Sequence, residues 1–165
     1  MRIILLAIAC CTIGLVTSCS RSLNDATLTE PQVLEFCKRL EAASLQPDVD
    51  VTMSFFASNA TIIVKNAHKP DQKPIIFDKA KYHAHMQHYF QITSNLTGGV
   101  TGRNITIQND GTSAIVKTTA KAEATRGGDH RKWSTEKDMT VELIESKLLI
   151  TRVTATSKWI RNSNK

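Results

Sequence analysis

Three of the five histidines and both tyrosines of this chain fall within residues 81–90, KYHAHMQHYF. Helical residues advance by about 100° each, so five side chains would share one face: Tyr82, His85, Met86, Tyr89 and Phe90. A histidine at the edge of a pocket could act as a general base near neutral pH, with Tyr82 or Tyr89 beside it. His85 is therefore the candidate catalytic histidine.

The same histidines give little support to a metal site. His85 and His88 are three residues apart, but a zinc ion needs three or four converging ligands. No HExxH pattern or nearby carboxylate–histidine pair supplies the others. We therefore expect no metal and no cofactor. We predict an amphipathic helix whose aromatic face covers a sheet, with His83 and His88 in water.

Start signals define this helix and two earlier ones. Asp78 is placed to cap the helix that carries the histidines. Upstream, Thr29 is a plausible N-cap for a helix over residues 30–44. Pro47 then begins a shorter helix that we expect to end near Ala57.

The predicted strands fall into two groups. Two short β-branched runs precede the histidine helix: ATIIVK, residues 60–65, and IIF, residues 75–77. After it, four long runs are separated by turns at Asn109-Asp110-Gly111, Gly127-Gly128 and Ser146-Lys147. Asp-Gly and Gly-Gly between alternating runs are strong hairpin signals, so the four runs predict an antiparallel meander.

The N-terminus carries a secretory signal pattern, in which Arg2 precedes an apolar run too short to span a bilayer. The run ends in Val16-Thr17-Ser18-Cys19, which resembles the lipobox of bacterial lipoproteins. The resemblance implies cleavage after residue 18 and a lipid anchor on Cys19. Because Ser20 and not Asp follows, it also implies the periplasmic face of the outer membrane. The alternative is an ordinary signal peptide with an incidental Cys19.

Cysteine use agrees with a lipoprotein. Cys10 and Cys11 would leave with the signal, so Cys37 is the one cysteine expected in the folded part. It lies on a helical stripe with Val33, Phe36 and Leu40. A free cysteine on such a stripe is usually a small buried apolar residue, so we predict a core position and not a reactive thiol.

The order of these elements is similar to that of the nuclear transport factor 2-like superfamily, also called SnoaL-like or cystatin-like. The segments that carry the resemblance are VLEFCKRLEA, MSFFASNATIIV and FDKAKYHAHMQHYF, followed by the long strands. It implies an α+β cone, in which a curved antiparallel sheet wraps over three N-terminal helices and leaves a pocket. The chain then divides into a signal peptide (1–18), a tether (19–28), a domain (29–160) and a tail (161–165).

Strand alternation predicts the polar groups of that pocket. The smaller and more apolar face of each strand should look inward, and its polar members are Thr118, Thr135, Lys137 and Thr151. The absence of an acid weakens an acid–base enzyme, although a β-bulge would change the phase within a strand. By analogy with enzymes of the superfamily, Asp50 is the nearest candidate partner for His85.

Composition sets broad limits on function. The 165 residues carry a net charge of +6 with neutral histidines, spread without a dense basic block, so nucleic acid is not an expected partner. We expect a membrane-anchored periplasmic lipoprotein whose domain is a non-catalytic binding or assembly module. Its expected partners are an envelope protein, a small hydrophobic ligand, or a second copy that meets the sheet face. The alternative is a small-molecule isomerase, dehydratase or cyclase that uses His85.

Overall fold

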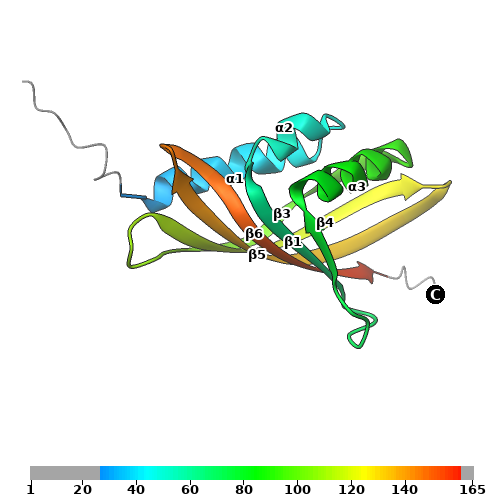
Figure 1. Ribbon diagram of the computed structural model, residues 1–165. Coiled ribbons are helices and arrows are strands. Elements are labelled where there is room, and N and C mark those ends of the chain that lie inside the picture. The colour runs from blue at the N-terminus through cyan, green and yellow to red at the C-terminus, as the bar shows by residue number, and fades with distance from the viewer. Residues whose placement is uncertain (1–26, 161–165) are drawn as a thin grey trace, which may run out of the picture.

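A computed structural model describes residues 27–160, whose elements follow the predicted order (Figure 1). The helices are α1 (Glu30–Ser44), α2 (Val49–Met53) and α3 (Lys79–Gln91). The strands are β1 (Phe56–Asn66), β2 (Ile75–Asp78), β3 (Thr93–Ile107), β4 (Ser113–Arg126), β5 (Asp129–Ile144) and β6 (Lys147–Ile160). The predicted signal peptide (1–18), Cys19 and the tail (161–165) lie outside the described residues.

The helix starts agree with the predicted caps. At α1 the Thr29 amide donates to the Gln32 side chain over 2.9 Å, and at α3 the Asp78 carboxylate accepts from the Lys81 amide over 2.8 Å. The second helix is shorter than predicted, because it ends at Met53 and not near Ala57. Ala57 is buried as part of β1, so tertiary packing takes this segment into the sheet.

The strands form one six-stranded sheet in the order β2-β1-β6-β5-β4-β3. Strands β3 to β6 make the predicted antiparallel meander, and Gly111 in its first turn has a φ of +66°, which glycine adopts without strain. Strand β1 joins β6 in parallel, with Ile62 opposite Val153. This pairing joins distant parts of the chain, and local alternation gives no signal for it.

Leu28, near the start of the described residues, belongs to the packed core. This residue is buried in the core cluster, and its amide donates to the Gly111 carbonyl over 2.7 Å. The end of the predicted tether is therefore tied to the first turn of the meander. None of the helices within residues 27–160 is long and apolar enough to cross a membrane.

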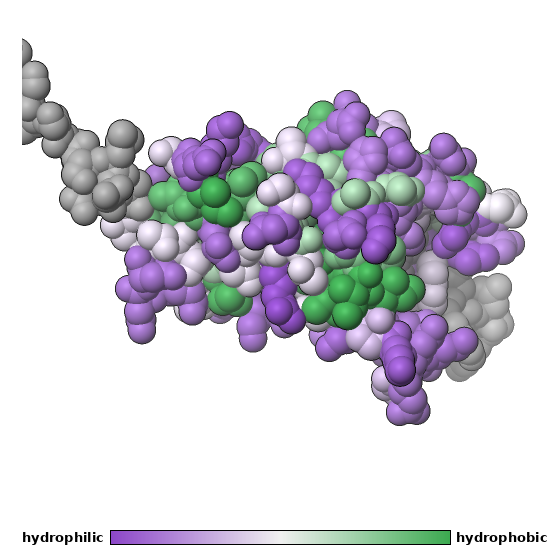
Figure 2. Space-filling model, in the orientation of Figure 1, coloured by the Kyte–Doolittle hydropathy of each residue, from purple (hydrophilic) through white to green (hydrophobic). Residues whose placement is uncertain are grey.

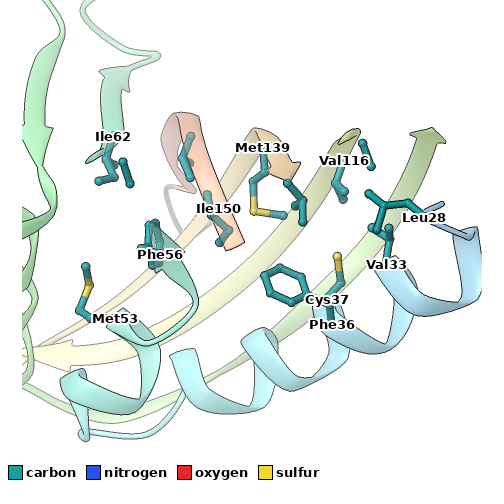
Figure 3. Close-up of a cluster of buried hydrophobic side chains, with 14 of the residues drawn as sticks. Leu28, Val33, Phe36, Cys37, Met53, Phe56, Ile62, Val116, Met139 and Ile150 are labelled. Carbon is teal, nitrogen blue, oxygen red and sulfur yellow. The ribbon is translucent and has the colours of Figure 1, made fainter. Parts of the chain in front are cut away.

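Helices α1, α2 and α3 lie on one side of the sheet (Figure 1). Val33, Phe36 and Cys37 of α1 point toward the sheet, where Met139 and Ile150 meet them (Figure 3). Cys37 is buried as predicted, and burial raises the pKa of its thiol although the charge of Arg103 opposes the shift. Its burial makes Cys37 a core residue, and the raised pKa keeps the thiol protonated and unreactive.

Of the three strands whose inward face was predicted, β6 departs from the predicted alternation. On β6, Ile150 pairs with Val141 and Arg152 with Thr140, so Thr151 is an extra residue without a partner on β5. This β-bulge moves Ile150 to the buried face, and the inward phase resumes at Val153. The prediction that Thr151 looks into the pocket was therefore wrong.

The outer surface is largely polar on the side shown in Figure 2, where hydrophobic patches stay separate from one another. The large hydrophobic residues exposed within residues 27–160 are Leu45, Val51, Ile75, Ile76, Trp159 and Ile160. They lie within residues 45–76 and at the end of β6.

Candidate ligand-binding site

A cavity of about 630 Å³ lies between the inner face of the sheet and helices α1 and α3. This volume falls within the range of small-molecule pockets, about 300–1,000 Å³. Three cross-strand rows of β4, β5 and β6 form its sheet side: Thr118-Lys137-Ala155, Ala120-Thr135-Ser157 and Ala122-Trp133-Trp159. The first row borders the packed core and the third ends at the exposed Trp159. The alanines leave the space that the cavity occupies.

Three of the four predicted polar groups line this cavity. Thr118 and Thr135 are buried, and the Thr135 and Ser157 hydroxyl oxygens lie 3.0 Å apart. Lys137 lies in the first row, between Thr118 and Ala155. Thr151 instead donates to the Glu142 carboxylate over 2.6 Å, outside the lining, as its place in the bulge requires.

Lys137 is the unusual member of this set. Burial lowers the pKa of its ammonium below the ordinary 10.5. Within residues 27–160 the structure gives that ammonium no hydrogen-bond or ion-pair partner. The next residue on the same face of β5 is the buried Met139. The cavity therefore holds an uncompensated positive charge next to the core.

We expect Lys137→Met to stabilise the domain at pH 7, by about 1 kcal/mol. With a lowered folded-state pKa, unfolding takes up a proton between that value and about 10.5, so wild-type stability rises with pH in this window. The advantage of the variant should shrink as the pH approaches 10.5. Urea denaturation of both proteins at several pH values measures this difference in the free energy of unfolding. A variant less stable than wild type at pH 7 would mean that Lys137 has a compensating partner.

His85 projects from α3 to the cavity edge. Its ring packs on Phe77 with centroids 5.0 Å apart and stacks on Tyr82 at 6.2 Å. Burial, with repulsion from His88 and Arg126, lowers the pKa of His85, so the ring is neutral at pH 7. In the part of the chain that the structure describes, no carboxylate binds it. His85 has the right protonation state for a base but lacks a partner that would orient it.

Both tyrosines of α3 also line the cavity and are partly buried. Burial and the neighbouring Tyr89 raise the pKa of Tyr82 to about 12. Burial likewise raises the pKa of Tyr89. Each phenol therefore stays protonated at neutral pH and can donate a hydrogen bond to a ligand.

Two predictions, for Asp50 and for His83, were wrong. Asp50 is 88% exposed and accepts from His83 over 2.7 Å, outside the cavity, so it is not a partner for His85. This contact also makes His83 a paired, partly buried residue and not a solvated one. His88 stays exposed, as predicted, and also lines the cavity.

One charged pair at the cavity was missed from the sequence. Arg103 of β3 forms an ion pair with Glu41 of α1, and Glu41 is the one acid among the described residues that line the cavity. The signals were present, because Arg103 alternates with Ile105 and Ile107, and Glu41 follows Cys37 by four residues. No group of three or more histidine, cysteine or acidic residues that could hold a metal occurs within residues 27–160.

Comparison with solved structures shows the same architecture in three proteins of low sequence identity. A conserved protein from Planctomyces limnophilus has a TM-score of 0.66 at 17% identity, over 79% of this chain and 97% of that one. An NTF2-like protein of unknown function from Pseudomonas putida has a TM-score of 0.63 at 11% identity, over 82% and 91%. A ketosteroid isomerase-like protein from Erwinia carotovora atroseptica has a TM-score of 0.58 at 8% identity, over 76% and 92%.

No protein-family model and no curated protein matches the sequence. At these low sequence identities, structural similarity shows that the fold is shared and does not show a shared activity. The chain has the nuclear transport factor 2-like α+β fold that its sequence predicted.

Proposed function

We propose that the domain is a non-catalytic module that binds a small hydrophobic ligand in its cavity. The observation that carries the proposal is the 630 Å³ space itself, which Trp133 and Met139 line without filling. An apolar pocket with a few convergent polar groups is the usual form of a small-molecule site. Thr118, Thr135 and the tyrosines of α3 supply those polar groups.

The alternative, a small-molecule isomerase, dehydratase or cyclase, would use His85 as its base. The neutral ring at pH 7 favours this role. Such chemistry also needs a group that orients the base or takes up charge. The one acid on the described lining, Glu41, is held by Arg103. The arrangement therefore supports binding better than acid–base catalysis.

A neutral fluorescent probe tests the binding role. We expect N-phenyl-1-naphthylamine to bind the wild-type domain, and Ala122→Phe to weaken that binding by about tenfold or more, because the new ring fills the space beside Trp133. Fluorescence titration measures the affinity. Ala84→Phe, on the exposed side of α3, is the matched control and should bind like wild type. Absent binding, or equal loss in both variants, would refute the binding role.

We further propose that a lipid on Cys19 anchors the module to the periplasmic face of the outer membrane, on the strength of the lipobox-like Val16-Thr17-Ser18-Cys19. Cys19→Ser should abolish incorporation of labelled palmitate and release the protein from the membrane fraction. Cys11→Ser, in the same N-terminal segment, should change neither. Unchanged membrane association and electrophoretic mobility in Cys19→Ser would contradict lipidation.

A further inference from the structure

The charges that line the cavity are strongly unbalanced. Six of its described lining residues are basic, and one of them, Arg131, is paired with Asp129 over 3.2 Å: Lys65, Lys73, Lys121, Arg126, Arg131 and Lys137. The one acid, Glu41, is already paired with Arg103. Lys65, Lys73 and Lys121 are exposed, so the charge at the inner end is that of Lys137. A cavity of one sign with apolar walls concentrates ligands of the opposite sign.

Within this set, Lys137 differs from the others by its depth. Its row borders the buried Val116-Met139-Val153 row, whereas Trp159 and Arg131 mark the outer end, where the guanidinium lies 5.6 Å from the indole ring. A purely apolar ligand that filled the inner end would cover the ammonium without compensating it, which is unfavourable. An anionic group at the same place would compensate it.

We propose that the cavity selects a monoanionic carboxylate amphiphile, whose carboxylate pairs with Lys137 and whose apolar part extends toward Trp133 and Trp159. The inference rests on the proposed binding function and specifies its ligand class. One ammonium at the inner end matches one negative charge, so a dianionic phosphate monoester would keep an unpaired charge there. Thr118 and Thr135, in the same and the next row, are hydroxyl donors near that end.

Isothermal titration calorimetry with decanoate and decan-1-ol tests the assignment on the folded protein. The two probes share their chain and differ in the head group. We expect wild type to bind decanoate at least about tenfold more tightly than decan-1-ol. Lys137→Met should remove the preference without weakening decan-1-ol, and Lys137→Arg should keep it. Lys117→Met is the matched control, since Lys117 is an exposed lysine opposite Asp138 on the outer face of the same sheet.

Each outcome decides between defined alternatives. Equal affinity for the two probes in wild type, or a preference that persists in Lys137→Met, would overturn the assignment and leave the binding function standing. If Lys117→Met lost the preference for decanoate to the same extent, the preference would depend on net charge alone. That result would also overturn the assignment. If neither decan-1-ol nor N-phenyl-1-naphthylamine binds wild type, the proposed function fails as well. The affinity of wild type for decanoate should also fall as the pH rises toward 10.5, because the Lys137 ammonium loses its proton. This measurement requires no variant.

Discussion

Replacing Ile150 by alanine is expected to lower the free energy of unfolding by about 3 kcal/mol. Ile150 is 0% exposed and lies opposite the equally buried Val141, and its amide donates to the Phe55 carbonyl over 2.8 Å. Removing its branched side chain leaves a void in a part of the core that the sheet and α1 enclose. The midpoint of urea denaturation should fall, with an unchanged slope.

Ile76→Ala is the matched control, because Ile76 is 63% exposed on β2. Ile76→Ala should lower the free energy of unfolding by less than about 0.5 kcal/mol. The comparison also tests the bulge at Thr151. If β6 kept a regular alternation with Thr151 inward, Ile150 would face water, and the two alanine variants would cost the same.

The second large effect concerns the ion pair between Arg103 and Glu41. Glu41→Met should lower the free energy of unfolding by about 2 kcal/mol. The Arg103 side chain is 16% exposed and would keep a largely buried charge without its partner. Its Nε already has no partner within the described residues. Arg103→Met should cost about 1 kcal/mol, because the Glu41 side chain is 34% exposed and can reach water.

The double variant, with methionine at both sites, should recover to within about 1 kcal/mol of wild type, since apolar residues of similar volume can replace a buried pair. Urea denaturation of all four proteins gives the coupling energy. If the effects of the two single variants were additive, the two side chains would not interact in solution. Glu41 would then be an unpaired acid in the cavity. That result would strengthen the enzyme alternative.

The sequence predicted the elements that local patterns define. The caps Thr29 and Asp78, the Asp110-Gly111 turn, and the alternation of β4 and β5 all have strong short-range signals, and the structure agrees with them. Inward placement of Thr118, Thr135 and Lys137 follows from that alternation. The bulge at Thr151 has no glycine or proline to mark it, so its change of phase was missed.

What the sequence could not predict depends on long-range packing. The contact of Asp50 with His83 joins α2 to α3, and the pair of Glu41 with Arg103 joins α1 to β3. Both depend on how helices cross the sheet. The space beside Ala120 and Ala122 has the same origin, because small residues leave a cavity only where the facing helix does not fill it.

Methyl NMR during a titration with decan-1-ol tests the central claim, that this space is a ligand site, most directly. We predict saturable shifts of the Ala120, Ala122 and Met139 methyl signals, which line the cavity. The exposed Val51 and Ile76, which lie outside it, should not respond. Shifts confined to Val51 and Ile76, or no saturable shift up to the solubility of the alcohol, would contradict the claim.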